Sequence, residues 1–377
     1  MRHKQVSINK ITPPELPKVV LRKHLFRILD KKEHYQATWV SAMAGSGKTT
    51  LVASHLNNNN FPCLWYQMDE GDGDIATFFY YLGLAAKKAT PRKRKPLPLL
   101  TPEYLPGISV FARRFFENLC SRVSPPFYVI FDNYHEISLE SPFHDVFKDA
   151  LSGISPDIHV IVMSRTDPPQ AFAGMLANNK MRIIGSDDLR LNLEESKEVI
   201  RIEAGKKISG KIIKRIYEKT QGWAAGLILM AKTTGTDDTL PRLSDKFTPE
   251  KIFEYFAIEL FDKMNKNYRE FLLKTAFLPS ITISMANALT GQNDANRILS
   301  SLRSNHLFTE KFSTPAGIYQ YHPLFREFLI ARAEDTLDQK KYAYCNNGLL
   351  NFLKHPVRLR MQLICFLKPK IIKILSY

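Results

Sequence analysis

The chain has 377 residues and a mass of 43.3 kDa, which is enough for two or three domains with buried cores. Hydrophobic residues make up 44% and charged residues 24%, so the composition is that of a globular protein and excludes a peptide hormone, a disulfide mini-protein or a disordered chain. The net charge of +16 attracts nucleotides, nucleic acid and acidic surfaces alike, and by itself it does not choose among them.

The spacing of the cysteines and the length of the apolar stretches indicate the cellular compartment of the protein. The four cysteines lie far apart, without the spacing of a zinc site or a disulfide framework, which indicates a reducing environment. The basic N-terminus lacks the apolar core of a signal peptide, and no stretch approaches the roughly 18 apolar residues that span a bilayer. We therefore expect a cytoplasmic protein that makes no contact with a membrane.

Short apolar runs alternate with helical patterns through the first half of the chain. Five runs predict strands, the last one more weakly: residues 36–43, 61–68, 127–132, 158–164 and 181–185. A helical pattern covers 74–88, and the proline-rich stretch 89–106 predicts a surface loop. Continuously apolar strands are typical of a parallel sheet covered on both faces, so we predict an α/β doubly wound domain with its ligand at the carboxyl ends of the strands.

The pattern changes to helices after Leu193. The stretches that predict helices are 193–204, 209–220, 222–234, 248–263, 265–278, 283–290, 294–304 and 324–336. Two short strand-like runs, 306–312 and 318–322, precede the last of these helices. Helices followed by a hairpin are the usual order of a winged-helix domain, and the polar stretch 234–245 predicts a linker before it.

The most specific motif follows the first predicted strand. Residues 42–49 match the phosphate-binding pattern GxxxxGK[ST] at every position except the first, which is Ala42. In this pattern glycines let backbone N–H groups close around phosphate oxygens, the lysine reaches the β- and γ-phosphates, and the hydroxyl that follows binds Mg²⁺. The candidate nucleotide-binding residues here are Gly45, Ser46, Gly47, Lys48, Thr49 and Thr50.

Two later strands end in residues that suit the same site. Asp132 follows an apolar run and is the expected metal-orienting carboxylate, so that Thr49 and Asp132 form the candidate Mg²⁺ site. Arg165 follows the run 158–164, and its guanidinium could bind a γ-phosphate bidentately if the two strands are neighbours. We take Asp132 and Arg165 as the candidate catalytic residues.

Ordered blocks over about residues 8–336 resemble the STAND-class signal-transduction ATPases, and among them the MalT-type, LuxR-like transcriptional activators. The blocks are KITPPELPKVVLRKHL, SAMAGSGKTTL, LWYQMDEGDGDIATFFYYL, YVIFDNYHEI, VIVMSRTDPP, GSDDLRLNLEES, TQGWAAGLILMA and YQYHPLFREFL. Members of this family also carry Ala or Ser at the first position of the phosphate loop. The resemblance implies a P-loop NTPase parallel sheet, then a helical domain and a winged-helix domain, folded around ADP in a resting state.

The resemblance also implies roles for residues outside the loop. His322 looks like the winged-helix histidine that contacts the nucleotide phosphates and locks the closed state. The stretch 19–22 looks like the N-terminal segment on the adenine side, and Trp223 with the small residues after it matches a helical-domain motif, where a packing role is expected. Relatives commonly carry a second aspartate after Asp132, whereas this chain has Asn133, and an amide cannot act as a general base.

We expect four regions: a nucleotide-binding α/β domain at 1–190, a small helical domain at 191–240, a winged-helix domain at 245–340 and a basic tail at 341–377 that resembles the start of a helical-repeat domain. The sensor repeats and helix-turn-helix domain of the family are not found before Tyr377, which is the pattern of a truncated form or a stand-alone switch module.

The sequence therefore predicts an ATP/ADP-binding regulatory switch of a MalT-like transcriptional regulator, with at most slow ATP hydrolysis. The expected partners are nucleotide, and in the ATP state a second copy or another protein; direct DNA binding by this chain is not expected. Two alternatives stay open. One is a P-loop ATPase coupled to nucleic acid, which the +16 charge favours, and the other is a catalytically degraded nucleotide-binding module, which Asn133 favours.

Overall fold

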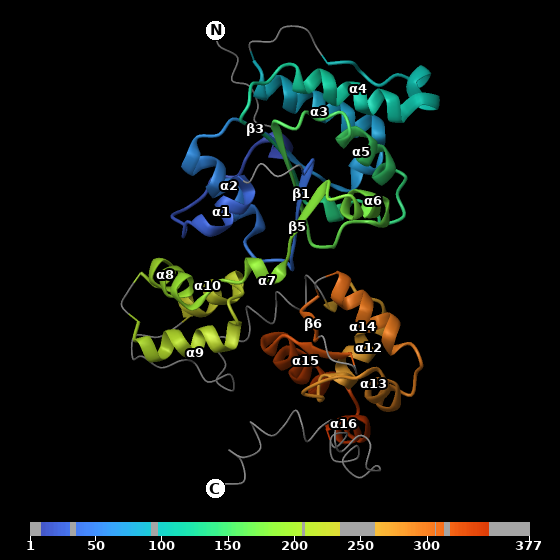
Figure 1. Cartoon of the computed structure of the whole chain (residues 1–377). Coiled ribbons are helices and arrows are strands. Elements are labelled where there is room, and N and C mark those ends of the chain that lie inside the picture. Colours follow the sequence, from blue (N-terminus) through green and yellow to red (C-terminus); the bar gives the residue numbers. More distant parts are fainter. Residues whose placement is uncertain are drawn as a thin grey trace. The chain divides into compact units, whose positions relative to one another are not determined.

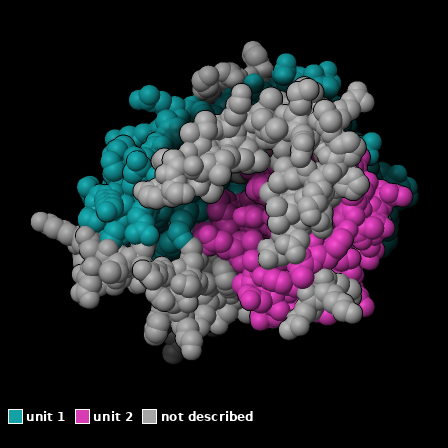
Figure 2. All heavy atoms as spheres, turned by 90° about the horizontal axis from the view of Figure 1, so that it is seen from below, with its two compact units in different colours: residues 1–239 teal, residues 240–377 magenta. Residues whose placement is uncertain are grey.

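The computed structural model describes residues 9–30, 35–91, 97–205, 208–233, 261–305, 307–312 and 317–346. The chain divides into two compact units, Met1–Thr239 and Leu240–Tyr377, which Figure 2 colours separately, and each is described by itself. The predicted linker 234–245 and all but the last three residues of the predicted helix 248–263 lie outside the described residues. Within the described ranges, no helix is both long and apolar enough to cross a membrane.

A five-stranded, fully parallel sheet forms the centre of the first unit (Figure 1). Its strands are β1 (Ala37–Ser41), β2 (Cys63–Gln67), β3 (Phe127–Asp132), β4 (Ile158–Ser164) and β5 (Met181–Ile184). The order across the sheet is β2-β3-β4-β1-β5, so β4 lies between β1 and β3. All five predicted strands and the α/β fold class are confirmed, and the carboxyl ends of β1, β3 and β4 are neighbours.

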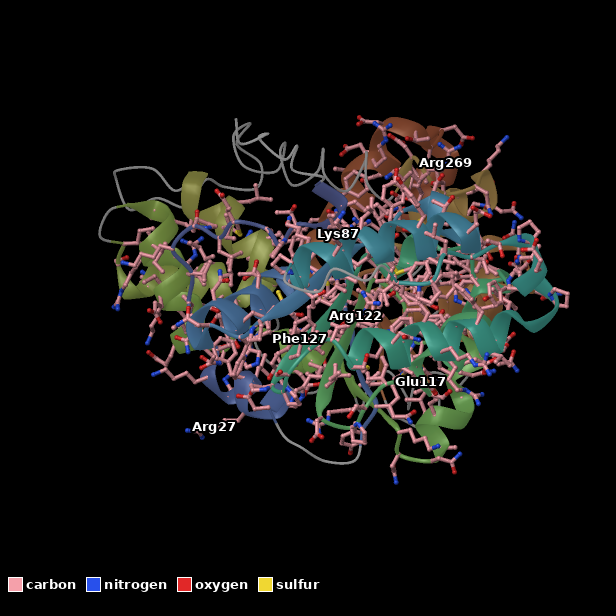
Figure 3. The ribbon with its side chains drawn as sticks, turned by 90° about the horizontal axis from the view of Figure 1, so that it is seen from above. Arg27, Lys87, Glu117, Arg122, Phe127 and Arg269 are labelled. Carbon is pink, nitrogen blue, oxygen red and sulfur yellow. The ribbon has the colours of Figure 1, made fainter. Side chains whose placement is uncertain are left out.

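Helices cover both faces of this sheet, which is why apolar residues dominate its strands. One hydrophobic core joins α1 (Lys23–Asp30) and α2 (Lys48–Asn59) to one face. The other core joins the opposite face to three more helices, α3 (Ile75–Ala89), α4 (Ile108–Cys120) and α5 (Phe143–Leu151). In Figure 3 the aromatic ring of Phe127 belongs to this second core, whereas the charged side chains of Arg27, Lys87 and Glu117 are exposed.

The region between β2 and β3 holds more helix than the sequence predicted. The stretch 89–106 was expected to be a surface loop, and it contains the short 3-10 helix η3 (Pro102–Gly107). Proline at the first helical position presets the backbone angle for such a turn, and every residue of η3 is nevertheless exposed. Helix α4 follows η3, and α5 lies further on, between β3 and β4. No helix was predicted at either place, and each helix buries one apolar face against the sheet.

A three-helix bundle follows β5 within the same unit. It consists of α8 (Leu193–Ala204), α9 (Gly210–Thr220) and α10 (Ala224–Thr233), at the positions the sequence predicted. Asn192 caps α8 by accepting a hydrogen bond from the N–H of Glu195, whose carboxylate accepts from the Asn192 N–H in return. Short helices complete the unit: η1 (Asn9–Ile11), η2 (Glu70–Gly73), η4 (Tyr134–Glu136), η5 (Gln170–Phe172), α6 (Ala173–Ala177) and α7 (Ser186–Leu189).

The second unit contains a winged-helix arrangement. Its helices are α12 (Lys266–Thr275), α13 (Ile283–Thr290), α14 (Ala295–Ser304), α15 (Pro323–Thr336) and α16 (Gln339–Asn346). The strands β6 (Thr309–Phe312) and β7 (Ile318–Tyr321) pair antiparallel between α14 and α15, as the predicted hairpin requires. Residues 347–377 of the predicted basic tail lie outside the described residues.

Candidate functional site

The loop that joins β1 to α2 has the backbone of a phosphate-binding loop. Gly45 and Gly47 adopt left-handed backbone angles, with φ of 72° and 83°, which glycine tolerates without strain. Helix α2 begins at Lys48, and no side chain caps its N-terminus at Gly47. The first N–H groups of a helix have no partner within the helix and carry partial positive charge, so this end of α2 favours an anion.

The Lys48 ammonium folds back onto the loop. Its Nζ donates to the carbonyl oxygens of Ala42 at 2.6 Å and Met43 at 3.1 Å. Burial, and after it the positive charge of Arg165, lowers the pKa of Lys48 to about 8, while the charge of Asp132 acts in the opposite direction. A partly buried ammonium of lowered pKa, on which the charge of Arg165 also acts, gains most from an anion that binds between the two cations.

Thr49 and Asp132 meet at the carboxyl edge of the sheet. The Thr49 hydroxyl donates to Asp132 Oδ2 at 3.1 Å, and the Asn133 N–H donates to Asp132 Oδ1 at 2.9 Å. Burial raises the pKa of the Asp132 carboxyl, an effect that the hydrogen bonds from Thr49 and Asn133 and the charge of Lys48 oppose. A hydroxyl and a carboxylate side by side are oxygen donors of the kind that Mg²⁺ prefers, so the pair fits the predicted metal site.

Arg165 follows β4 in a tightly held turn. The Ser164 hydroxyl oxygen accepts the Thr166 N–H at 3.0 Å, and the indole N–H of Trp39 donates to the Thr166 carbonyl at 3.0 Å. The charge of Arg165 lowers the pKa of both Lys48 and His135, so its guanidinium acts on the same site as the loop lysine. A phosphate-binding role for Arg165 requires that its strand neighbours those of the loop and of Asp132, and β4 does pair with both β1 and β3.

His135 belongs to this site, and sequence reasoning missed it. Desolvation, then the charges of Arg165 and Lys48, lowers the pKa of its imidazole to about 3. The left-handed backbone of Asn133, with φ of 60°, turns the chain directly after Asp132 and precedes η4, which carries His135. The signal available in the sequence was a histidine three residues after the acidic strand end.

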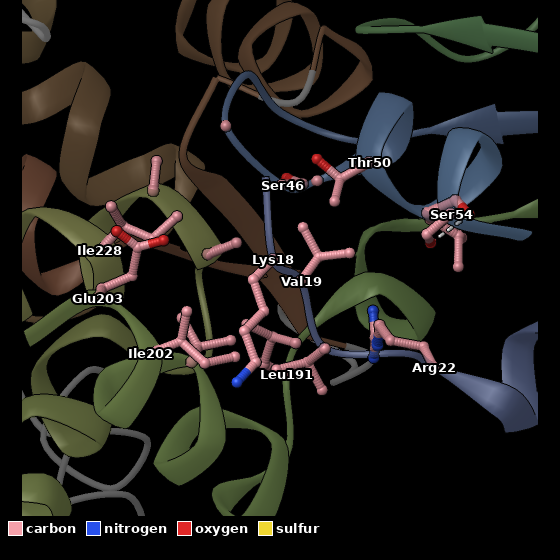
Figure 4. A pocket seen from close by; sticks show the side chains of 17 residues that line it. Lys18, Val19, Arg22, Ser46, Thr50, Ser54, Leu191, Ile202, Glu203 and Ile228 are labelled. Atoms are coloured by element: carbon pink, nitrogen blue, oxygen red, sulfur yellow. Dashed lines mark hydrogen bonds between the residues drawn. The ribbon is translucent and has the colours of Figure 1, made fainter. Parts of the chain in front are cut away.

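A cavity of about 280 Å³ adjoins the phosphate loop. Figure 4 shows that three parts of the first unit line it: the N-terminal segment with Lys18 and Val19, the loop and α2 with Ser46 and Thr50, and the helical bundle. The lining residues are Lys18, Val19, Val20, Arg22, Gly45, Ser46, Gly47, Thr50, Leu51, Ser54, Leu191, Val199, Ile202, Glu203, Ala224, Ala225 and Ile228. The walls are mainly aliphatic, which suits a flat, apolar group such as a nucleobase attached to the phosphates.

Arg22 fixes the N-terminal segment of this cavity. It is buried, and its guanidinium donates to the backbone carbonyls of Leu189 and Arg190, each at 2.8 Å, and to the carboxylate of Glu195 at 3.1 Å. These acceptors lie at the junction between the sheet and the helical bundle. Of the stretch 19–22, Val19, Val20 and Arg22 line the cavity, whereas Leu21 is exposed.

The helical bundle contacts the backbone of the phosphate loop itself. The buried indole N–H of Trp223 donates to the Ala44 carbonyl at 3.0 Å, and the Ala225 N–H donates to the Gly45 carbonyl at 3.0 Å. A Cβ atom on Gly45 would stand 2.5 Å from the Cβ of Ala225. The small residues at the start of α10 therefore let the bundle pack directly on the loop, and the packing role expected for Trp223 includes a hydrogen bond that the sequence did not reveal.

The remaining predicted site residues have distinct places. Gly45, Ser46, Gly47 and Thr50 line the cavity, and the Ser46 hydroxyl donates to the Met43 carbonyl within the loop at 2.8 Å. His322 belongs to the second unit, where it is buried and precedes α15, and its backbone N–H donates to the Phe308 carbonyl at 2.8 Å.

Comparisons with known proteins agree with this architecture. The family model of the MalT winged helix domain matches residues 257–341. The Walker-type ATPase of Pyrococcus abyssi is similar in structure with a TM-score of 0.60 at 15% identity, over 84% of this chain and 99% of that chain. At that identity the likeness shows the fold alone.

Two further solved structures match with lower TM-scores, which support no argument. The Aeropyrum pernix Orc1 protein in complex with DNA has a TM-score of 0.41 at 10% identity, over 84% of this chain and 95% of that chain. The Thermotoga maritima RuvB Holliday junction branch migration motor has a TM-score of 0.37 at 13% identity, over 81% and 92%. The chain thus has a Walker-type ATPase fold, and its C-terminal half contains a winged helix that matches the MalT type.

Proposed function

We propose that the chain is an ATP/ADP-binding regulatory switch of the MalT-like, STAND type. The observation that carries this proposal is the cavity beside the phosphate loop, because helices α8 and α10 of the bundle form part of its wall. A ligand there would contact the loop and the bundle at once. The proposed regions are those of the sequence analysis: 1–190, 191–240, 245–340 and 341–377.

In the proposed site, different residues of the chain bind different parts of the Mg²⁺–nucleotide complex. The loop N–H groups and Lys48 bind phosphates, Thr49 and Asp132 would hold Mg²⁺, and Arg165 would bind the γ-phosphate and so distinguish ATP from ADP. Mg²⁺, when bound, supplies charge neutralisation for the phosphates. On the strength of the family resemblance alone, His322 is proposed as a further phosphate contact that favours the ADP state.

A few contacts can supply the free energy that such a switch needs. A shift from 1:99 to 99:1 between two states needs about 5.5 kcal/mol of differential binding. Each charge-assisted hydrogen bond contributes about 1.5–3 kcal/mol. Two or three bonds that form with ATP but not with ADP would therefore move the population almost completely, and slow hydrolysis would reset it.

The proposal predicts that Lys48→Ala abolishes binding of MgADP and MgATP, because it removes the partly buried ammonium of the loop. The measurement is equilibrium binding by calorimetry, with the exposed Lys87→Ala on α3 as a matched control that should bind normally. Undiminished affinity in Lys48→Ala would overturn the site assignment. The nucleotide released on denaturing the purified protein gives the resting state, for which we expect ADP.

The net charge of +16 favours one competing function, an ATPase that nucleic acid stimulates. That function predicts ATP turnover that rises when DNA or RNA is added and falls with salt. An ATP turnover rate that does not change when nucleic acid is added excludes this competing function and does not contradict the proposed switch.

A further inference from the structure

His135 is a buried imidazole whose ring nitrogens are not used by the fold. Only 11% of its side chain is exposed, and both nitrogens are buried. Among the described residues neither nitrogen has a hydrogen-bond partner; the nearest carboxylate oxygen, on Glu136, lies 3.3 Å from Nε2 without hydrogen-bond geometry. Buried polar atoms without partners cost free energy, so an imidazole kept in this condition points to a ligand that supplies the missing bonds.

The surroundings of His135 identify that ligand as one that belongs to the phosphate site. The cations that act on the ring come from two other elements, Lys48 at the start of α2 and Arg165 after β4. Asp132 lies three residues earlier, at the end of β3, and accepts the Thr49 hydroxyl. His135 is therefore within electrostatic reach of the cations proposed to hold the phosphates.

The same surroundings decide which protonation state the imidazole has. The two cations and burial hold its pKa at about 3, so the unliganded ring is neutral at physiological pH. A neutral imidazole has one N–H donor and one nitrogen acceptor. It can thus accept a hydrogen bond from water, whereas a ring of such low basicity does not hold a full proton.

Hydrolysis of a nucleoside triphosphate depends on side chains that position the reactants. The attacking water must be oriented toward the γ-phosphorus, a task that a side-chain hydrogen-bond acceptor performs in other phosphoryl-transfer sites. Asn133, at the position where a second carboxylate would stand, is an amide that cannot accept a proton. Its left-handed backbone turns the chain directly into η4, which carries His135.

We propose that His135 is the water-positioning residue of this site: one ring nitrogen accepts a hydrogen bond from the water that attacks the γ-phosphate of ATP. This inference rests on the proposed nucleotide-binding function. In the step, the water oxygen bonds to the γ-phosphorus, and the bond from that phosphorus to the bridging oxygen breaks. The electron pair leaves with ADP, and both water protons end on the released phosphate, so that His135 gains no net proton.

The test compares His135→Ala with His135→Gln in the full chain. Glutamine keeps an acceptor for water and alanine does not. We expect His135→Ala to slow phosphate release in a single turnover by about 100-fold, the lower end of the usual contribution of such groups. His135→Gln should retain at least about a tenth of the wild-type rate. Equilibrium affinities for ADP and for a non-hydrolysable ATP analogue should stay within about threefold in both variants.

His144 supplies a matched control from the same region of the chain. Its ring is also buried, but both nitrogens have partners: the Tyr134 hydroxyl at 2.9 Å and the Ser138 carbonyl at 2.9 Å. His144→Ala should therefore lower the thermal midpoint without changing the rate of phosphate release by folded protein. The thermal midpoint of His135→Gln should stay close to that of the wild type, because no native hydrogen bond is lost, and that of His135→Ala should fall less than that of His144→Ala, because only packing is lost.

Each other outcome overturns the proposal. Equal rates in wild type, His135→Ala and His135→Gln exclude a role for His135, and equal loss in both variants excludes water positioning by a simple acceptor. A loss of affinity that matches the loss of rate shows a structural role. A wild-type protein that binds ATP but releases no phosphate refutes this inference alone, whereas one that binds neither ATP nor ADP refutes the proposed function.

Discussion

Lys48 holds its ammonium against two carbonyl oxygens of its own loop while burial and Arg165 hold its pKa near 8. The ammonium thus has hydrogen-bond acceptors without a ligand, but its pKa is lower than that of an ordinary lysine. Phosphates that bind beside it would stabilise the charged form and raise this pKa. Nucleotide binding above pH 8 should therefore take up a proton at Lys48.

This linkage predicts a pH dependence of nucleotide affinity. Affinity should be constant just below pH 8 and fall by up to about tenfold for each pH unit above it, the slope for one coupled proton. Calorimetry at pH 9 in two buffers of different ionisation enthalpy should show the uptake of about one proton. The exposed-lysine variant Lys87→Ala should keep the same slope, and a constant affinity between pH 7 and pH 9.5 would contradict the assignment of Lys48.

In the unliganded protein, the same lowered pKa predicts that stability changes with pH in the direction opposite to nucleotide affinity. Because the folded pKa of Lys48 is about 8 and its usual value is 10.5, the unfolded chain binds more protons between those pH values. The contribution of Lys48 to the free energy of unfolding should accordingly increase with pH across that window. One group would thus make the empty protein more stable and the nucleotide complex weaker as the pH rises.

The sequence predicted those site residues that belong to a motif with fixed spacing or that end an apolar strand. These are the loop from Gly45 to Thr50 and the strand end at Asp132. In the structure the Thr49 hydroxyl lies 3.1 Å from an Asp132 carboxylate oxygen. His135 was missed because its place depends on the left-handed turn at Asn133, which has no unique sequence signature. The hydrogen bond from Trp223 to Ala44 joins residues far apart in the chain, which no local pattern encodes.

Strands and helices differ in how far the sequence determined them. Strand β3 alternates its side chains between the two cores, Phe127, Val129 and Phe131 on one and Tyr128 and Ile130 on the other, so burial on both faces leaves a continuous apolar run that is easy to recognise. Helix α4 buries a single face. Its aromatic residues follow a proline-rich stretch, where turn signals dominated the interpretation.

The contact between α10 and the phosphate loop leads to a prediction for Gly45. Gly45→Ala places a side chain at φ of 72° and 2.5 Å from the Cβ of Ala225, both of which are unfavourable. We expect it to lower the free energy of unfolding by about 1–3 kcal/mol, the usual cost of a strained backbone position, and to weaken nucleotide binding. Chemical denaturation and calorimetry measure the two effects.

Two further variants separate the causes. Gly174→Ala, in α6, meets open space and has no left-handed angle, so it should be neutral or slightly stabilising. Adding Ala225→Gly to Gly45→Ala removes the closest steric clash but leaves the backbone strain and the 3.1 Å approach to Trp223 Nε1, and should restore part of the lost stability. If the double variant is no more stable than Gly45→Ala, the close approach of α10 to the loop is not what makes glycine necessary there.

On the scale of the whole molecule, the two units follow from two ways of burying apolar surface. In the first unit a parallel sheet needs helices on both faces, and in the second a two-stranded hairpin and several helices bury apolar side chains such as Leu272, Leu299 and Phe325. All residues that line the cavity belong to the first unit. The described residues of the first unit thus supply the lining of the cavity, and any effect of the second unit on nucleotide affinity is a separate, measurable free energy.

The proposed role of His322 predicts the size of that free energy. A fragment of residues 1–239 should bind ADP, and the full chain should bind it more tightly by about one charge-assisted hydrogen bond, roughly 1.5–3 kcal/mol or 10- to 150-fold. His322→Ala in the full chain should reduce ADP affinity to that of the fragment, provided that its second unit still unfolds cooperatively. The affinity for ATP should change less, because the proposed histidine contact favours the ADP state. Equal ADP affinity in the fragment, the full chain and the variant would refute a phosphate-locking role for His322.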